Sequence, residues 1–303
     1  MPGVAWITGG AGFIGTAVAR RFHRDNWTVL GLDRRTPEAG HPLQFTCVGG
    51  DISDASLKEA LTRTGSPDVI FHGAGTPSVG RAAADPESAA VDTVESARIT
   101  LEFLRARAPA AVFIVPSSAA VYGAAGDTAL CEALPPRPIS HYGVLKLQVE
   151  QLCEAASRSY GLSTFVIRFF SVYGPGLRKQ LPWELGNRIL SGESPIDLAG
   201  SGLETRDFLH VDDAADLIWR AGRSSGHRII NGGSGTSTSV HDFAQNLVKA
   251  CGRTPKFRFT GDNRPNDPKH YLADIAEARA LGWAPMIPLA EGLTSYAAWL
   301  RRI

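Results

Sequence analysis

The sequence has 303 residues, of which 44% are hydrophobic and 20% charged, an ordinary globular composition with room for one large domain or two smaller ones. Lysine and arginine together number 31, and aspartate and glutamate 30, so the formal net charge is +1. This balance gives no electrostatic reason to expect nucleic acid or an anionic membrane as a partner. Any anion must therefore be bound by a few placed Arg and Lys side chains.

The four cysteines are scattered and form no CxxC pair; they are Cys47, Cys131, Cys153 and Cys251. This spacing argues against a zinc site and a disulfide framework, so we expect no bound metal and reduced thiols in a cytoplasmic protein. No apolar run approaches the ~18 residues that a membrane span needs. The first ten residues are typical of an initial strand rather than of a signal peptide.

Short apolar runs alternate with longer amphipathic stretches over the first two-thirds of the chain. The pattern predicts strands at 4–8, 27–32, 44–48, 68–72, 110–116 and 163–169. It predicts helices at 13–25, 57–64, 85–108 and 140–160. Strands that alternate with helices and are apolar throughout indicate a parallel sheet covered on both faces. The sequence therefore predicts an α/β fold with a doubly wound parallel sheet.

The amino-acid composition changes after about residue 170, where Gly, Pro and Arg become frequent and the predicted elements become shorter. Helices are predicted at 240–251, 276–281 and 289–300, and a strand followed by a helix at 210–222. We expect a large domain over 1–170, with a return of the chain to it at 205–232. A smaller α/β lobe is expected over 171–204 and 233–303.

A glycine-rich loop joins the first predicted strand to the first predicted helix. Its glycines, Gly9, Gly12 and Gly15, follow a GxxGxxG spacing. In such a loop the first glycine permits a tight turn, the second lets backbone amides approach a pyrophosphate, and the third lets the helix pack on the strand. We expect these glycines, with Phe13 and Ile14, to contact a bound dinucleotide.

An acidic residue, Asp33, ends the second predicted strand, 18 residues after Gly15. A carboxylate at this place accepts hydrogen bonds from the ribose hydroxyls of an adenosine. Arg34 and Arg35 follow it directly, and a guanidinium there is suited either to stack on adenine or to bind a 2′-phosphate. Because Asp33 repels such a phosphate, we expect NAD rather than NADP, with Arg34 among the residues that contact it.

A hydroxyl, a phenol and an ammonium group follow the fifth predicted strand. Ser118 lies at its carboxyl end, and Tyr142 and Lys146 are four residues apart in the next helix and so share one face. A phenol has a pKa of about 10. A neighbouring ammonium lowers that pKa, so that the phenol acts as a base near neutral pH.

With these motifs the chain resembles the extended short-chain dehydrogenase/reductases that modify nucleotide sugars, an NAD-dependent epimerase/dehydratase group. The matching segments are 8–15, 50–52, 72–75, 117–123, 142–146, 168–175, 205–213 and 264–267. The resemblance implies a dinucleotide-binding Rossmann domain and a nucleotide-sugar-binding lobe. It also implies that Tyr142 is the catalytic base, that Lys146 lowers its pKa and holds the nicotinamide ribose, and that Ser118 is the catalytic hydroxyl.

The resemblance assigns further residues to the cofactor and to the substrate. Asp51 and Ile52 would contact adenine, and Gly73 and Ala74 are also expected to bind the cofactor. The residues expected at the substrate are Ser118, Ser171, Arg178, Arg206 and Arg264.

Among these, fork-shaped guanidinium donors suit the diphosphate. We expect Arg206 and Arg264 to hold it. An alternative for Arg206 is a structural ion pair with Asp207, Asp212 or Asp213. Ser171 replaces the Asn that many members carry.

Two alanines, Ala119 and Ala120, stand where the dehydratases of the family carry Asp and Glu. Removal of water from C5 and C6 of a sugar needs an acid and a base besides Tyr142, and methyl groups supply neither. We therefore predict epimerisation at C4 of a nucleoside-diphosphate sugar through a 4-keto intermediate. The alternative is an NAD(P)H-dependent reductase of a nucleotide-linked 4-keto-6-deoxy sugar. The resemblance also implies a homodimer formed through the helices at 87–108 and 140–160.

Overall fold

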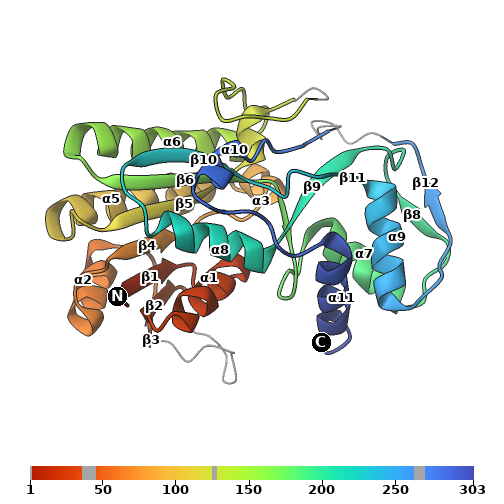
Figure 1. Cartoon of the computed structure of the whole chain (residues 1–303), viewed down its shortest axis with the longest axis horizontal. Helices are drawn as coiled ribbons and strands as arrows, with labels where there is room; N and C mark the ends of the chain where they lie inside the picture. Colours follow the sequence, from red (N-terminus) through yellow and green to blue (C-terminus); the bar gives the residue numbers. More distant parts are fainter. Residues whose placement is uncertain (1, 36–45, 125–127, 263–269) are drawn as a thin grey trace. The chain divides into compact units, whose positions relative to one another are not determined.

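The computed structural model describes residues 2–35, 46–124, 128–262 and 270–303, which form two compact units (Figure 1). Unit 1 comprises Met1–Gly123, Pro135–Phe169 and Ala215–Ile230. Unit 2 comprises Ala124–Leu134, Phe170–Ala214 and Asn231–Ile303. Within the described ranges, no helix has both the length and the apolar character needed to cross a membrane.

The main sheet contains seven strands in the described part of the chain. They are β1 (Val4–Thr8), β2 (Thr28–Asp33), β3 (Thr46–Gly49), β4 (Val69–His72), β5 (Val112–Ser118), β6 (Ser163–Phe169) and β10 (His227–Gly232). Their order is β10-β6-β5-β4-β1-β2-β3, and neighbours from β3 to β6 are parallel. This confirms the doubly wound parallel sheet of the Rossmann type that the sequence predicts.

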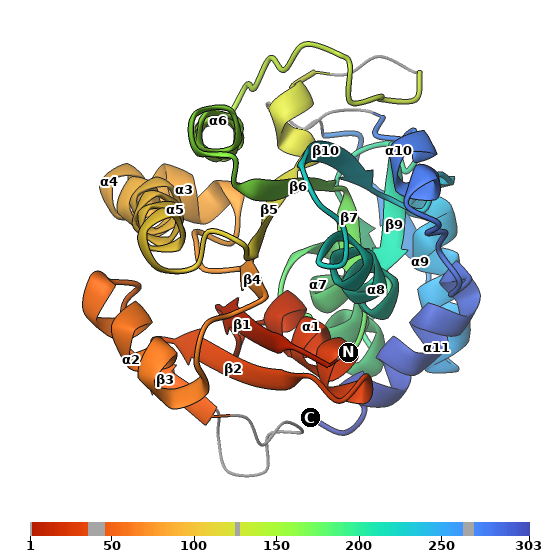
Figure 2. The same ribbon diagram turned by 60° about the vertical axis from the view of Figure 1, so that its left-hand side comes forward.

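Helices cover both faces of this sheet (Figure 2). One face carries α2 (Asp54–Thr64), α5 (Ser96–Arg107) and α6 (His141–Tyr160), which share a single buried apolar cluster with the strands. The other face carries α1 (Phe13–Arg24) and the part of α8 (Val211–Ala221) that belongs to unit 1. An ion pair of 2.8 Å between Arg21 and Asp216 joins these two helices.

The long helix predicted at 85–108 is interrupted. It consists of α4 (Pro86–Ala90), a π-helical turn η1 (Val91–Glu95) and α5, and a short α3 (Val79–Ala84) precedes it. In a π-turn one extra residue enters the helical repeat, and such turns are frequent at functional sites. The apolar spacing of the sequence does not reveal this extra residue.

Unit 2 is built from shorter elements. Its strands are β7 (Ser171–Tyr173), β8 (Ile196–Leu198), β9 (Thr205–His210), β11 (Ser237–Ser239) and β12 (Phe257–Phe259). Its helices are α7 (Gln180–Leu190), α9 (Val240–Cys251), α10 (Ala276–Ala280) and α11 (Leu289–Leu300). Among the described residues, β11, β9 and β7 form one sheet and β12 and β8 another. Phe208 stacks on Phe243 at 4.1 Å between ring centroids and anchors the core of this unit.

Candidate active site

The glycine loop lies between β1 and α1, and its backbone is tightly folded. Gly9 has a φ of +66°, in the left-handed region that favours glycine. A Cβ on Gly15 would lie 2.2 Å from the Gly9 carbonyl oxygen, so only glycine fits there. Among the described residues, no side chain caps α1 at Gly12, which leaves the first-turn amides of Phe13 and Ile14 for a ligand. This donor set fits a pyrophosphate.

The end of β4 meets the glycine loop. A Cβ on Gly9 would lie 2.8 Å from the Gly73 carbonyl, and the Ala74 amide donates a hydrogen bond of 3.0 Å to the Thr8 hydroxyl. β1 and β4 are neighbours where the strand order reverses, which is the place where sheets of this kind bind dinucleotides. The structure thus brings together the predicted cofactor residues of both loops.

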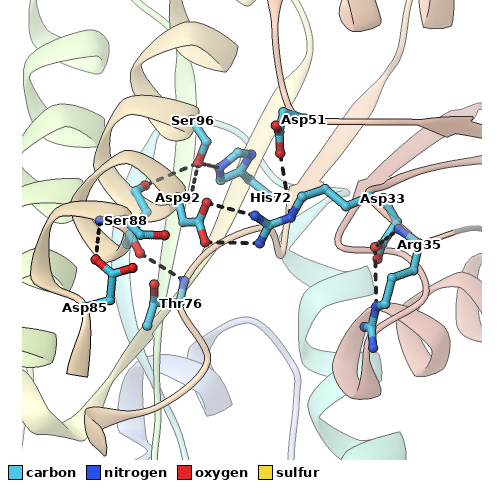
Figure 3. Close-up of polar contacts among 11 residues, drawn as sticks. Asp33, Arg35, Asp51, His72, Thr76, Asp85, Ser88, Asp92 and Ser96 are labelled. Carbon is cyan, nitrogen blue, oxygen red and sulfur yellow. Dashed lines mark hydrogen bonds and ion pairs between the residues drawn. The ribbon is translucent and has the colours of Figure 1, made fainter. Parts of the chain in front are cut away.

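Asp33 lies next to the same loop. Its largely buried carboxylate accepts hydrogen bonds from the backbone amides of Ala11 at 3.0 Å and Arg35 at 2.9 Å. These bonds orient the Asp33 carboxylate toward the glycine loop. Its remaining lone pairs can still accept hydrogen bonds from ribose hydroxyls. Asp51 follows β3, and its carboxylate lies 3.7 Å from the Arg34 guanidinium (Figure 3). Ile52 is half-buried beside it.

Ser118, Tyr142 and Lys146 come together as the sequence predicts. Ser118 ends β5, and its hydroxyl hydrogen-bonds the Tyr142 phenol. A Cβ on Gly143 would lie 2.7 Å from the Ala120 carbonyl, so this glycine lets α6 approach the end of β5. The Lys146 ammonium lies 5.6 Å from the Tyr142 ring centroid. It also donates a hydrogen bond of 2.9 Å to a backbone carbonyl of β5.

The acidity of Tyr142 differs from the expected one. Burial raises the pKa of Tyr142 to about 12, and the hydrogen bond from Ser118 lowers it by a smaller amount. The expectation that Lys146 brings this pKa down is not met in this structure, because the loss of hydration of the phenolate outweighs every stabilising contact. The phenol is therefore protonated near neutral pH unless more positive charge is placed beside it.

A buried ion pair supports this site, although the sequence pattern predicts no role for it. Arg168 on β6 donates charge-assisted hydrogen bonds to both carboxylate oxygens of Glu150 on α6, the shortest being 2.7 Å. Ser117 donates a hydrogen bond of 2.5 Å to the same carboxylate. These contacts tie β5, β6 and α6 together directly beside Ser118. Arg168 lies within the family-like segment 168–175, but Glu150 lies outside all of these segments, so the sequence carried no signal for the pair.

The two alanines after Ser118 form part of η2 (Ala119–Tyr122), a 3₁₀ turn. Ala119 is buried, and the Ala120 amide donates a hydrogen bond of 3.2 Å to the Ser118 hydroxyl. Neither position can supply an acid or a base. The geometry therefore agrees with the sequence argument against dehydration.

Unit 2 contains the predicted substrate residues other than Ser118, beginning with Arg206. Arg206 is half-buried on β9, and its guanidinium donates to the Thr205 carbonyl at 2.8 Å. The carboxylates of Asp207 and Asp213 accept hydrogen bonds from backbone amides of unit 2. Both carboxylates are thus engaged in holding loops, which weakens the structural alternative for Arg206.

The other predicted substrate residues are placed differently. Ser171 opens β7 and pairs with Phe208 of β9. Arg178 is exposed, with its guanidinium 5.8 Å from the Trp299 ring centroid. Arg264 lies outside the described residues. The substrate roles of all these residues stay predictions.

A family model now decides the class of the protein. The model of the NAD dependent epimerase/dehydratase family matches residues 5–233. The chain belongs to this family. The match includes the glycine loop, Asp33 and the Ser118, Tyr142 and Lys146 cluster, so the family assignment and the geometry rest on the same segments.

Known proteins similar to this member of the family cover nearly all of its length. A UDP-glucose 4-epimerase of Mycolicibacterium smegmatis is 32% identical over an alignment of 311 positions, which covers 97% of each chain. The crystal structure of a UDP-glucose 4-epimerase with UDP-glucose from Thermotoga maritima matches with a TM-score of 0.89 and 26% identity over 99% of both chains. A UDP-glucuronic acid 4-epimerase from Bacillus cereus, solved with UDP-glucuronic acid and NAD, matches with a TM-score of 0.87 and 27% identity over 99% of both chains.

Proposed function

We propose that this protein inverts C4 of a nucleoside-diphosphate sugar with NAD as its cofactor. The observation that carries the proposal is the half-buried, hydrogen-bonded Ser118–Tyr142 hydroxyl pair with the Lys146 ammonium beside it, and two alanines instead of acids directly after Ser118. This arrangement supports oxidation and reduction of a carbinol but not removal of water. Similar proteins that act as 4-epimerases on UDP-glucose and UDP-glucuronic acid support the same reaction.

The residues of this chain divide the work. Bound NAD supplies the acceptor, and then the donor, of the C4 hydride. Tyr142 takes the proton of the C4 hydroxyl as the C4–H bond breaks, and Ser118 hydrogen-bonds the same oxygen. The resulting 4-keto sugar rotates so that the opposite face of its C4 carbonyl is presented to the cofactor. When the hydride returns to C4 on that face, Tyr142 returns the proton to the C4 oxygen. C4 is then inverted, with no net oxidation.

The cofactor is held by unit 1. The α1 amides at Phe13 and Ile14 take its pyrophosphate, and Asp33 takes the adenosine ribose. Lys146 has two roles, because its ammonium binds the nicotinamide ribose and adds positive charge near Tyr142. With Lys146 in place, the pKa of Tyr142 is still about 12 in the protein without cofactor, so the positive charge of the nicotinamide ring would have to lower it further.

The substrate's nucleotide is assigned to unit 2. Arg206 and Arg264 bind the diphosphate, Arg178 contacts a phosphate or a sugar carboxylate, and Ser171 contacts the sugar. The support for this assignment is the exposed or half-buried position of Arg178 and Arg206, together with the use of neighbouring carboxylates by backbone amides. We propose UDP-hexoses as the first substrates to test, since UDP is the nucleotide in the names of the similar epimerases reported above.

The test is incubation of purified protein with UDP-, dTDP-, GDP- and CDP-hexoses, without added NADH, followed by NMR of the sugar protons. The expected result is interconversion of a sugar nucleotide and its C4 epimer with no change in absorbance from NADH. Protein that leaves every hexose nucleotide untouched, but oxidises NADH or NADPH stoichiometrically with a nucleotide-linked 4-keto-6-deoxy sugar, is a reductase instead.

We also propose that the protein is a cytoplasmic homodimer. The support for a dimer is apolar surface on the two helices concerned, where Val91 is 62% exposed and Val144 39% exposed. The support for the cytoplasm is that Cys131, Cys153 and Cys251 are free thiols. Light scattering that gives twice the mass of one chain is the expected result, and the mass of a single chain contradicts the dimer.

A further inference from the structure

The Arg34 guanidinium is already engaged by a carboxylate of the same unit. It donates two hydrogen bonds to Asp92, one of 3.2 Å to Oδ1 and one of 3.1 Å to Oδ2. Its Nε also lies 3.7 Å from an Asp51 oxygen. Two parallel bonds between a guanidinium and one carboxylate fix both distance and orientation. The Arg34 guanidinium is therefore turned toward Asp92 of the π-turn, and Figure 3 marks the two hydrogen bonds at the Asp92 carboxylate with dashed lines.

The π-turn holds Asp92 firmly in this position. The Asp92 side chain is only 16% exposed, whereas that of Arg34 is 54% exposed. The Asp92 carbonyl accepts a hydrogen bond of 2.6 Å from the Ser96 hydroxyl, which contacts the His72 Nε2 at 3.1 Å. One residue further on, the Thr93 hydroxyl accepts a bond of 3.0 Å from the backbone amide of a residue that follows β4. Asp92 is thus the more buried partner of the pair, and Arg34 the more exposed one.

Charge around this cluster is unfavourable for another phosphate. Asp33, Asp51 and Asp92 bring three negative charges, and Arg34 and Arg35 bring two positive ones. A phosphate monoester adds about 1.5 to 2 negative charges at neutral pH. A 2′-phosphate on the adenosine ribose would need a free guanidinium, and Arg34 is the one that follows the ribose-binding Asp33.

We propose that Asp92 is a specificity-determining residue, which excludes NADP by holding Arg34 away from the 2′-phosphate position. Asp33 alone repels a 2′-phosphate, but an adjacent free arginine can offset that repulsion. The Asp92 pair removes the compensation that Arg34 would give, and the Arg35 guanidinium lies 3.8 Å from the Asp33 carboxylate itself. The pair thereby favours NAD over NADP. The inference rests on the proposed function only in taking NAD as the cofactor.

The experiment is a competition for the cofactor site. Purified protein is incubated with equal concentrations of NAD and NADP and passed through a desalting column, and the dinucleotides released on denaturation are quantified by chromatography. Asp92→Asn keeps the shape of the side chain and removes its charge. We expect it to raise the ratio of bound NADP to bound NAD by about tenfold or more, the scale of one charge-assisted hydrogen bond.

Two further variants make the expected result specific. Glu87→Gln removes the same charge from the exposed first turn of α4, on the segment that leads into η1, and should leave the ratio unchanged. The double variant Asp92→Asn with Arg34→Ala should return the ratio to that of the parent, because the freed guanidinium is what binds the phosphate. A rise that persists without Arg34 contradicts the proposal.

An unchanged ratio in Asp92→Asn protein that still carries NAD overturns the proposal. If that variant does not fold, Arg34→Ala alone decides, since this exposed side chain can be removed without opening a cavity. The proposal expects no change in the ratio, and a fall shows that Arg34 reaches the phosphate while Asp92 is present. Bound nucleotide is measured independently of epimerisation, so failure here and failure of the proposed function are separate results.

Discussion

The two units hold their polar side chains in different ways. In unit 1, Ser118, Tyr142 and Lys146 lie at the carboxyl end of a buried strand and on a long helix, with hydrogen bonds between elements. In unit 2, Arg178 is exposed in the connection between β7 and α7, and Arg206 is half-buried on β9. Groups held by hydrogen bonds between long elements keep a fixed geometry, whereas guanidinium groups at the surface can change partners without loss of the fold.

This difference suggests a division of labour. Redox chemistry at C4 is the same for many sugar nucleotides and needs a rigid site, which unit 1 offers. Recognition of a particular nucleotide and sugar varies, and unit 2 offers side chains that can vary. Even within unit 1, the selection among cofactors that we assign to Asp92 acts through Arg34, which is exposed like Arg178 of unit 2. Each of the following variants tests this comparison.

The largest effect is expected from Tyr142→Phe in unit 1. The ring stays and the proton acceptor is lost, so turnover should fall by at least ~10², the usual scale for a general base. NAD should remain bound, as measured by release on denaturation. Tyr160→Phe, on the exposed end of the same helix, is the matched control and should retain full activity. Near-normal turnover of the Tyr142 variant would remove this residue from the mechanism.

A smaller loss is expected from Ser118→Ala. The hydrogen bond from Ser118 lowers the pKa of Tyr142, so its removal raises that pKa further above its usual value. Because the phenolate is the active form, the rising limb of the pH–rate profile should move to higher pH, and turnover at neutral pH should fall by about 10- to 100-fold. Ser118→Thr keeps a hydroxyl and should restore the profile. A profile that does not move assigns Ser118 a purely structural role.

The positions of the site residues that lie at the carboxyl ends of strands were predictable from the sequence. Residues such as Asp33 and Ser118 end apolar runs, and parallel strands bring their carboxyl ends to one edge of a sheet. What sequence could not give is the state of the groups after burial. The pKa of Tyr142 depends on how much water α6 excludes, and the Arg34–Asp92 pair depends on a π-turn that the apolar spacing conceals. Unit 2 was least predictable, because three-residue strands carry little periodicity.

In unit 2, Arg206→Ala should weaken nucleotide binding and leave the fold intact. Loss of a charge-assisted contact costs about 1.5–3 kcal/mol, or roughly 10- to 150-fold in affinity. Calorimetry with UDP and with UDP-glucose should show the same loss, because the contact is with the diphosphate. Arg279→Ala, an exposed arginine on α10, controls for the change in net charge. Unchanged affinity with a lower melting temperature would instead make Arg206 a structural partner within unit 2.

The smallest effect concerns stability, and it compares a buried histidine of unit 1 with an exposed one of unit 2. Burial, with a lesser contribution from the Lys146 charge, lowers the pKa of His72 to about 3. Its Nδ1 lies 3.2 Å from the Thr8 hydroxyl and its Nε2 3.1 Å from that of Ser96, so the neutral ring links β1, β4 and the helix that carries Asp92. The His241 side chain, on α9, is 50% exposed.

The pH dependence follows from the sign of the His72 shift. Below pH 6.5 the unfolded chain binds a proton at this residue, and the folded protein does not until the pH approaches 3. The stability that His72 contributes is therefore complete above pH 6.5 and is lost as the pH falls toward 3, by up to about 1.4 kcal/mol per pH unit. In urea unfolding, the stability difference between the parent and His72→Gln should narrow by about 2 kcal/mol between pH 6.5 and 5. His241→Gln is the comparison variant at an exposed position, and a difference for His72→Gln that stays constant over this range would show that His72 takes up its proton in the folded protein.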